Sequence, residues 1–424
     1  MAEFQKPRGT RDFAPEEMAR RRFVEANMRR TAELFGFGEV MTPTFESTEL
    51  FVARSGEGII DELYAFEDKG SRKISLRPEL TASVMRFYVN EMQNLPKPVK
   101  IFYFGNCFRY ERPQAGRYRE FWQFGAELIG APSIESDAEV IALALATLKN
   151  LGLKDVVVRI GHLSILNKFI RDLKISDNAE KEARRLIDKR NFEDLRSMLD
   201  GANANDEAIA RLIELVSLDG DEAIRRAKEE AGNNEGFGYL ANLLERLRAY
   251  GFDNCQLDFG VARGLDYYTG MVFEIDAPSL GAEKQVCGGG AYTLADLFGG
   301  QEVNSTGYAF GFDRIMLALE KSGVTVPSQN LSVYILPIGD EAKITAIQIL
   351  SELRNAGISA DMDLMGRNMS KAMKYANSIG VTKTILIGDN ELAENSVTVR
   401  DMRSGVQEKY PISDILRAFF KNIP

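Results

Sequence analysis

The chain has 424 residues, of which 45% are hydrophobic and 27% are charged, and its formal net charge at pH 7 is -9. These values are typical of a globular protein with roughly three domains, and the acidic excess disfavours a surface coated with basic side chains for nonspecific nucleic-acid binding. The first residues lack an apolar signal region, and no run of about 18 uncharged apolar residues occurs, so we expect a cytoplasmic protein without membrane contact.

The N-terminal part of the chain predicts a helix followed by a strand. Apolar residues recur at helical spacing over residues 15–35, opposite an arginine-rich face, and Gly36 and Gly38 then favour a stop. The segment EVMTPTFE at 39–46 is expected to form a strand. The apolar face of the helix is expected to consist of Met18, Phe23, Met28, Ala32 and Phe35.

An antiparallel hairpin is predicted for residues 99–128. Its first strand alternates so that Arg109 lies on the face opposite Phe102 and Phe104, and a turn at 113–116 leads into the return strand. The first face of the hairpin is polar and suits a ligand, whereas the second suits a core. On the return strand the first face carries Phe121, Gln123, Gly125 and Glu127, and the second carries Trp122, Phe124, Ala126 and Leu128.

Beyond the hairpin, the pattern predicts a helical insertion and a second domain. A charged, alanine-rich segment at about 164–250 has helical periodicity. Strand patterns then resume near Cys255 and end at 305–311, before a helix that begins at Asp313 and Arg314. The three glycines at 288–290 are expected to form a tight turn near the ligand or a plain loop. We therefore place a first domain at 1–325 and a compact α/β domain at 326–424.

The cysteine and histidine residues exclude several kinds of chemistry. Cys107, Cys255 and Cys287 are far apart and odd in number, so we expect buried thiols rather than a disulfide framework or a zinc site. His162 is the only histidine, and a structural role is expected because the sequence supplies no triad or metal partners for it. Catalysis must then rely on arginines, carboxylates, backbone amides or a metal carried by a ligand, and we expect no metal site built by the protein.

Three arginines stand where predicted strands end, namely Arg109, Arg263 and Arg314. Arginine suits phosphate because its planar guanidinium donates paired hydrogen bonds and keeps its charge. A single arginine at a strand end is more often solvated or structural, but three on adjacent strands of one sheet can converge on a polyphosphate. With Phe121 as a stacking surface, the expected ligand is ATP, although the chain lacks a GxxxxGK[ST] phosphate loop.

Several motifs carry a resemblance to a known family. The hairpin FRYERPQAGRYREFWQFGAE (108–127) resembles motif 2 of the class II aminoacyl-tRNA synthetases, GYAFGFDR (307–314) resembles motif 3, and the first helix with EVMTPTFE resembles motif 1. RGLDYYTG (263–270) and RGTRDF (8–13) are similar to histidyl-tRNA synthetases in particular. The resemblance covers essentially the whole chain. It implies an α+β fold, in which a class II antiparallel sheet with a helical insertion forms the catalytic core and a C-terminal α/β domain binds the anticodon.

The resemblance also implies roles for single residues. Arg109, Arg263 and Arg314 would be catalytic, the first two near the α-phosphate and the substrate carboxylate and the third at the γ-phosphate of ATP, with Phe121 under the adenine. Glu127 and Tyr268 would bind the two imidazole nitrogens of histidine. The full histidine-binding set would be Glu79, Leu80, Thr81, Arg109, Gln123, Glu127, Arg263, Tyr267 and Tyr268. The set facing tRNA would be Gln114, Arg117 and Arg119 at the acceptor end, and Arg367, Lys371 and Lys374 on one helix face of the second domain. An exposed charged face alone would also explain the last three.

The implied activity is that of a histidine-tRNA ligase. Such an enzyme uses ATP with Mg²⁺ to form histidyl-adenylate, transfers the histidyl group to tRNA(His), and works as a homodimer paired through motif 1. One alternative is a noncatalytic, synthetase-like regulatory subunit of ATP phosphoribosyltransferase, which would need neither ATP-binding arginines nor an anticodon domain. A synthetase for another amino acid is a second alternative, which RGLDYYTG disfavours. The chain departs from the family pattern at 288–293, where GGGAYT replaces GGGRYD, and at Trp122, where histidine is frequent.

Overall fold

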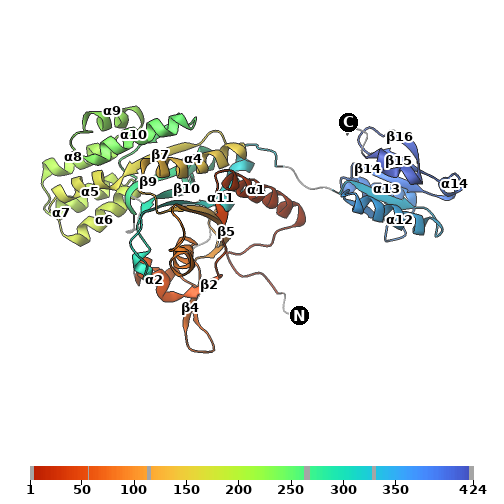
Figure 1. The fold of residues 1–424 in the computed structure, drawn as a ribbon, viewed down its shortest axis with the longest axis horizontal. Helices are drawn as coiled ribbons and strands as arrows, with labels where there is room; N and C mark the ends of the chain where they lie inside the picture. Colours follow the sequence, from red (N-terminus) through yellow and green to blue (C-terminus); the bar gives the residue numbers. More distant parts are fainter. Residues whose placement is uncertain (1–3, 56, 112–115, 262–267, 327–330, 420–424) are drawn as a thin grey trace. The chain divides into compact units, whose positions relative to one another are not determined.

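The structure is a computed structural model that describes residues 4–55, 57–111, 116–261, 268–326 and 331–419. The chain divides into two compact units, Met1–Val326 and Pro327–Pro424 (Figure 1). Among the described residues, none of the helices combines the length and the apolar character that crossing a bilayer requires.

In the described part of the first unit, the central element is an eight-stranded sheet with the order β1-β5-β6-β11-β10-β9-β7-β8. Neighbouring strands are antiparallel except at the two edges, where β1 pairs with β5 and β7 pairs with β8 in parallel. The hairpin predicted at 99–128 is confirmed as β5 and β6. The strands are β1 Gly38–Glu39, β5 Val99–Phe108, β6 Glu120–Ile129, β7 Val157–His162, β8 Cys255–Leu257, β9 Tyr268–Asp276, β10 Gln285–Tyr292 and β11 Ser305–Gly311.

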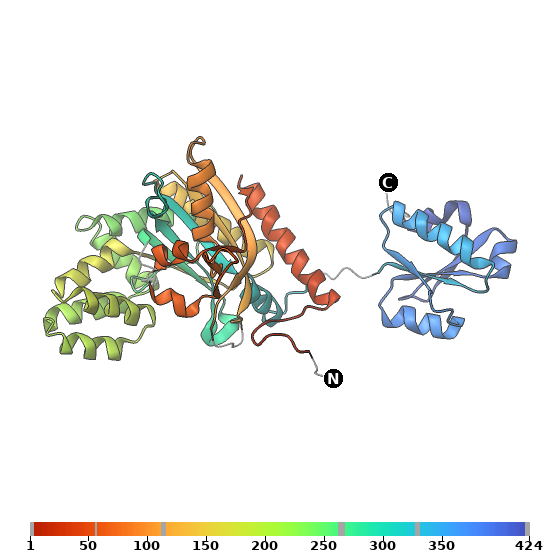
Figure 2. The same cartoon turned by 90° about the horizontal axis from the view of Figure 1, so that it is seen from below.

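The two faces of this sheet have different surroundings. Phe102 and Phe124 stack at 5.5 Å between ring centroids and belong to the main hydrophobic core, which α4 covers by packing on β6, β10 and β11. Helices α1 and α10 pack on α4, and Figure 2 shows the same helices from a second direction. The other face of the sheet carries the polar positions of the hairpin and lines a cleft, as the alternation predicts. The helices named here are α1 Pro15–Leu34, α4 Ile134–Asn150, α10 Glu235–Ala249 and, after β11, α11 Phe312–Lys321.

The first helix forms as predicted, but its expected apolar face is partly wrong. Met28 and Ala32 are buried, whereas Phe23 is 41% exposed and Arg21 is 4% exposed. Arg21 can be buried because its guanidinium forms an ion pair of 2.8 Å with Asp313. The helix therefore buries the paired guanidinium of Arg21 rather than the ring of Phe23, which hydrophobic periodicity favours for the core.

The single strand expected at 39–46 is wrong. Glu39 belongs to β1 of the large sheet, and Phe45 begins β2 of a three-stranded sheet with the order β2-β4-β3. Between them, Arg77 donates to the backbone carbonyls of Thr42 at 2.9 Å and Pro43 at 3.2 Å, and Pro43 has no N–H for a ladder. The elements of this region are β2 Phe45–Ser47, α2 Thr48–Ser55, η1 Glu57–Glu62, β3 Ala65–Glu67, β4 Lys73–Leu76, α3 Thr81–Phe87 and η2 Tyr88–Met92.

The glycines at 288–290 form neither the turn nor the loop that the sequence suggested, because they lie inside strand β10. A Cβ atom on Gly289 would lie 2.3 Å from the backbone oxygen of Gly307, and one on Gly290 would lie 2.5 Å from that of Met271. Glycine is therefore needed here for close approach of β10 to its two neighbours. The short helices η3 Pro278–Glu283 and η4 Asp296–Phe298 flank this strand.

The predicted helical insertion is confirmed between β7 and β8. It contains its own hydrophobic cluster, which includes Leu166, Leu195 and Leu212. Figure 1 shows these helices gathered at one end of the first unit. Besides α10, the insertion contains α5 Leu163–Asp172, α6 Asp177–Asp188, α7 Phe192–Gly201, α8 Asp206–Ser217 and α9 Gly220–Glu229.

The second unit is an α/β domain, as predicted. Its sheet has the order β13-β12-β14-β15-β16 within the described residues, and Ile335, Ile349 and Ile385 are part of its core. Strand β16 lies at the sheet edge, where its polar segment QEKYP is mostly exposed. A 3₁₀ helix follows it. The elements are β12 Val333–Pro337, α12 Ala342–Asn355, β13 Ala360–Met362, α13 Met369–Ser378, β14 Lys383–Ile387, α14 Asp389–Ala393, β15 Ser396–Asp401, β16 Gln407–Pro411 and η5 Ile412–Ala418.

Candidate active site

The cleft face of the large sheet carries two adjoining cavities, of about 290 Å³ and about 210 Å³. Arg109, Gln123, Gly288 and Ala309 line both of them, so the two cavities meet at the centre of the sheet. The residues predicted on the polar face of the hairpin are thus brought together at one place. We call them the larger cavity and the smaller cavity.

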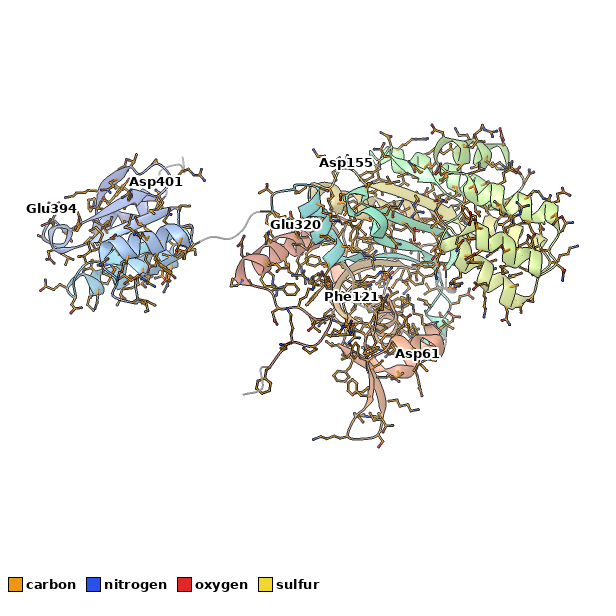
Figure 3. All side chains as sticks on the ribbon, turned by 180° about the vertical axis from the view of Figure 1, so that it is seen from behind. Asp61, Phe121, Asp155, Glu320, Glu394 and Asp401 are labelled. Carbon is orange, nitrogen blue, oxygen red and sulfur yellow. The ribbon has the colours of Figure 1, made fainter. Side chains whose placement is uncertain are left out.

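The larger cavity is lined by Phe121 and by two of the arginines predicted at strand ends, Arg109 and Arg314. The guanidinium carbon of Arg109 lies 5.4 Å from the centroid of the Phe121 ring, and its Nε donates to the carbonyl of Pro78 at 2.9 Å. Arg314, in the first turn of α11, donates from Nη1 to the carbonyl of Gln285 at 2.7 Å. Figure 3 labels the Phe121 side chain, which belongs to β6. Two fixed guanidinium groups and an aromatic ring suit a polyanion with a planar base.

Glu127 lies in the smaller cavity, and its side chain is almost fully buried. Its Oε1 accepts a hydrogen bond of 2.8 Å from the hydroxyl of Tyr103, and its Oε2 accepts one of 2.7 Å from the hydroxyl of Tyr292. Burial raises the pKa of Glu127 to about 7, although the two tyrosine hydroxyls act in the opposite direction. A carboxylate has about four lone-pair sites, so Glu127 can accept a further hydrogen bond from a ligand.

Two glycines make this arrangement sterically possible. A Cβ atom on Gly307, which is opposite Glu127 in the β6–β11 register, would lie 1.5 Å from Oε2 of Glu127. A Cβ atom on Gly125 would lie 2.4 Å from the hydroxyl oxygen of Tyr103. The carboxylate and the ring that supports it therefore occupy the space that these two glycines leave open.

Glu79, two residues before α3, lies at another side of the smaller cavity. Its carboxylate accepts backbone hydrogen bonds from Thr81 at 2.6 Å and Ala82 at 3.0 Å and forms an ion pair with Arg54. Thr81 also lines the cavity, whereas the side chain of Leu80 is buried in the hydrophobic cluster beneath it. Any contact of Leu80 with a ligand would therefore use its backbone.

Gln123 and Tyr268 complete the predicted residues of the smaller cavity that the structure describes. Gln123 accepts a hydrogen bond of 3.3 Å from the thiol of Cys107, and burial raises the pKa of that thiol to about 12. The ring of Tyr268 meets the ring of Tyr292 edge to face, with 6.4 Å between the centroids. A carboxylate, an amide and a phenol thus surround one space.

A buried carboxylate ties the N-terminal segment to the larger cavity. Asp313 precedes Arg314 and forms ion pairs with Arg11 at 2.6 Å and Arg21 at 2.8 Å. It also accepts the backbone N–H of Trp122 at 3.0 Å, so it joins α11, β6 and the N-terminal segment. Trp122 packs against the core, as its position on the second hairpin face predicts, but it also lines the larger cavity.

Of the three residues predicted to face the acceptor end of tRNA, the structure describes Arg117 and Arg119. Arg117 lines the larger cavity. Arg119 donates from Nε to the carbonyl of Glu111 at 3.2 Å and lies 4.2 Å from the ring centroid of Tyr110. Three predicted site residues lie outside the described residues: Gln114, Arg263 and Tyr267.

In the second unit, the predicted basic helix face is partly wrong. Lys371 and Lys374 are exposed on α13, but Arg367 precedes this helix. The guanidinium of Arg367 forms an ion pair of 2.7 Å with Asp363 and lies 4.2 Å from the ring centroid of Tyr375. The spacing suggested one face because Asn368, which caps the helix, was read as part of it.

The remaining single-residue expectations concern His162 and the cysteines. His162 caps α5 by accepting the backbone N–H of Ser164 at 3.2 Å, and burial lowers its pKa to about 4, so a structural role is confirmed. The three cysteines are free and buried, as predicted. Within the described residues, no group of three or more histidine, cysteine, aspartate or glutamate side chains is placed to hold a metal ion.

Sequence reasoning missed Tyr103 and Tyr292. Tyr103 shares the parity of Arg109 on the first hairpin strand, so alternation alone could have placed it beside Glu127. Tyr292 was missed because the glycines at 288–290, just before it, were expected to form a turn or a loop rather than part of a strand, so no strand alternation was applied to this segment.

Comparison with known proteins agrees with this geometry. A family model described as histidyl-tRNA synthetase matches residues 9–315, and one described as an anticodon binding domain matches residues 332–422. The histidine-tRNA ligase of Methanosarcina acetivorans is 48% identical over 412 residues, which are 97% of each chain.

Solved structures are similar over nearly the same length. The apo histidyl-tRNA synthetase of S. aureus has a TM-score of 0.73 and 30% identity, with 98% of this chain and 100% of that chain covered. A Bacillus halodurans protein described as an ATP phosphoribosyltransferase regulatory subunit/histidyl-tRNA synthetase has a TM-score of 0.78 and 27% identity, with 92% and 99% covered.

Proposed function

Since the chain belongs to the histidyl-tRNA synthetase family, we propose that its cleft joins histidine to ATP and passes the histidyl group on to tRNA(His). The protein is an aminoacyl-tRNA ligase, because curated relatives that match nearly its full length are histidine-tRNA ligases. A noncatalytic regulatory subunit is the weaker alternative, because it has no use for arginines in a polyanion cavity or for a second unit of the anticodon-binding type.

The observation that carries the choice of histidine is the buried carboxylate of Glu127 between two phenols. An imidazole N–H can donate to the free lone pair of a Glu127 oxygen, while the hydroxyl of Tyr268 at the cavity wall serves the other ring nitrogen. A site that hydrogen-bonds both edges of a ring rejects side chains that lack those groups. Glu79, Thr81 and Gln123 are then near enough to the same cavity to hold the α-amino group.

The first chemical step needs no nucleophile from the protein. An oxygen of the histidine carboxylate attacks the α-phosphorus of ATP, a new O–P bond forms, and the bond to the β-phosphate oxygen breaks to release pyrophosphate. Arg109 and Arg263 would neutralise charge at the α-phosphate, Arg314 would hold the γ-phosphate end, and Phe121 would support adenine. Catalysis then rests on in-line placement of two bound substrates.

Mg²⁺ would enter as the complex with ATP. The described residues offer no group of three or more acidic, histidine or cysteine side chains to hold it independently, whereas the larger cavity supplies cationic side chains for the phosphates. The metal would spread the charge of the leaving pyrophosphate.

The second step transfers the histidyl group from the adenylate to a hydroxyl of the terminal adenosine of tRNA(His), with AMP as the leaving group. Arg117, at the larger cavity, with Gln114 and Arg119 would face the acceptor end. Lys371 and Lys374 on α13 are exposed and suit phosphate contacts made by the second unit. Arg367 would hold this surface through Asp363.

We also propose that the enzyme is a homodimer in the cytoplasm, where tRNA and ATP meet. Around the motif that the sequence assigned to pairing, Leu34 is 64% exposed, Met41 is 81% exposed and Phe45 is 55% exposed. Three large apolar side chains on neighbouring segments favour burial against a second copy across a two-fold axis.

The activity is tested by ATP–pyrophosphate exchange with each amino acid in turn. Histidine alone is expected to stimulate exchange, and the same enzyme is expected to charge tRNA(His). Equal stimulation by threonine, proline or glycine would refute the proposed specificity. Histidine binding without exchange would instead favour the regulatory alternative.

A further inference from the structure

A cluster of ionic side chains at the far end of the sheet takes no part in the reaction described above. Arg159 on β7 forms ion pairs with Asp258 at 3.2 Å, Glu274 at 2.8 Å and Asp276 at 3.1 Å. The side chains of Asp258 and Asp276 are almost fully buried, and those of Arg159 and Glu274 are 16% and 14% exposed. Charges held this far from water remain paired, because an unpaired one is strongly unfavourable.

One end of this cluster reaches the larger cavity through Gln285. The side-chain Nε2 of Gln285 donates to Oε1 of Glu274 at 2.7 Å, and the backbone carbonyl of the same residue accepts from Arg314 at 2.7 Å. Gln285 and Arg314 line the cavity, whereas Glu274 does not. Gln285 makes both hydrogen bonds. The position of Glu274 therefore limits where the Gln285 carbonyl, which holds Arg314, can lie.

The other end of the cluster reaches the helical insertion. Arg190, between α6 and α7, forms an ion pair with Asp258, whose other oxygen accepts the backbone N–H of Gly260 at 2.9 Å. Asp258 therefore has an arginine from the sheet and an arginine from the insertion on the same carboxylate. A movement of the insertion that displaces Arg190 changes the charge balance around Arg159.

We propose that Glu274 is a positioning residue for Arg314 and that the insertion acts on the ATP site through it. The path, which we call the ionic relay, consists of Arg190, Asp258, Arg159, Glu274, Gln285 and Arg314. This inference rests on the proposed function, because Arg314 matters to the reaction as a phosphate ligand. The relay gives the insertion, which lies far along the sheet from the nucleotide, a physical connection to it.

The main test replaces Glu274 and measures the Kd for ATP by calorimetry together with the KM for ATP and for histidine in exchange. Glu274→Ala removes the acceptor for Gln285 and is expected to weaken ATP binding about five- to tenfold, the effect of one lost hydrogen bond, with the histidine KM unchanged. Glu274→Gln keeps an acceptor oxygen and is expected to restore much of the ATP affinity. This second variant also serves if the alanine variant does not fold.

Coupling to the insertion is tested with Arg190→Ala alone and combined with Glu274→Ala. If both residues act through one path, the double variant should lose less ATP binding free energy than the sum of the losses of the two single variants. The matched control is Glu182→Ala, which removes an exposed ion pair with Arg185 on the same insertion and is expected to leave both substrates unaffected.

The outcomes separate the relay from the function. Three results would overturn the relay. The first is an equal loss of affinity for ATP and histidine, and the second is an ATP Kd of Glu274→Ala within about twofold of the parent value. The third is additive losses of ATP affinity in the double variant. A parent enzyme without histidine-dependent exchange would overturn the proposed function, while its ATP Kd values would still decide the relay.

Discussion

Replacing Glu127 with glutamine tests how this site distinguishes histidine. The variant keeps the size of the side chain but exchanges an ionised acceptor, held by Tyr103 and Tyr292, for a neutral amide. A hydrogen bond to a charged group is typically worth about 1.5 to 3 kcal/mol, so kcat/KM for histidine is expected to fall about ten- to 150-fold at pH 8. The KM for ATP is expected to stay the same, because Glu127 lines the smaller cavity only.

The raised pKa of Glu127 adds a pH dependence to this prediction. With a pKa of about 7, the carboxyl of the free enzyme is about 90% ionised at pH 8 and about 10% ionised at pH 6. If the protonated carboxyl acts like the amide, the ratio of kcat/KM between parent and Glu127→Gln should therefore shrink about five- to ninefold from pH 8 to pH 6. Taking the ratio cancels the titration of the substrate's own imidazole, which both enzymes experience.

Stability gives an independent measurement of the same group. Because the pKa in the folded protein lies above the ordinary value of 4.5, the contribution of Glu127 to stability is complete below pH 4.5 and is lost as the pH rises through about 7. The free energy of unfolding of Glu127→Gln relative to the parent should therefore increase by about 3 kcal/mol between those pH values. A pH-independent kinetic ratio, or equal losses for ATP and histidine, would refute the reasoning and return Glu127 to a purely structural role.

Three further predictions follow from the geometry. Gly307→Ala places a methyl group 1.5 Å from Oε2 of Glu127 and should lower both the affinity for histidine and the melting temperature. The expected loss of folding stability is about 1 to 3 kcal/mol. The control is Gly201→Ala, whose added Cβ atom meets no neighbour within 4 Å and which should change neither quantity. A chain ending at residue 326 should keep histidine-dependent exchange but charge tRNA on the order of tenfold more slowly, and loss of both activities would show that the units do not work separately. Leu34→Asp with Met41→Asp should shift sedimentation from dimer to monomer at micromolar concentration, while the exposed Phe66→Asp should not, and an unshifted dimer would place the interface elsewhere.

The active-site hairpin could be predicted from the sequence because a strand repeats every two residues. Once Arg109 and Phe124 were assigned to opposite faces, the positions of Gln123 and Glu127 followed without further information. The helical insertion was equally accessible, since its periodicity extends over many turns.

The errors arose where a partner distant in sequence decides the local structure. Arg21 is buried because of Asp313, and the backbone near Pro43 leaves the sheet because Arg77 binds its carbonyls. The glycines of β10 suggested a turn because glycine permits turns. They are required here because the backbone oxygens of Gly307 and Met271 on the neighbouring strands leave no space for a Cβ atom. Periodicity within one segment contains no information about such partners.

The ion pairs of Asp313 also determine when this unit can finish folding. Arg11 and Arg21 are separated from Asp313 by 302 and 292 positions, so a ribosome that makes about 5 to 20 residues per second needs roughly 15 to 60 seconds to supply their partner. Until then the nascent first helix has a cation on its core side with no anion to pair with, and docking it would bury an uncompensated charge. We therefore expect the N-terminal helix to dock only after Asp313 has been synthesised. We expect the folding of the unit to finish with strand β11, which joins β6 to β10 in the middle of the sheet, and with helix α11, which carries Asp313. The larger cavity is then incomplete in any product truncated before Asp313.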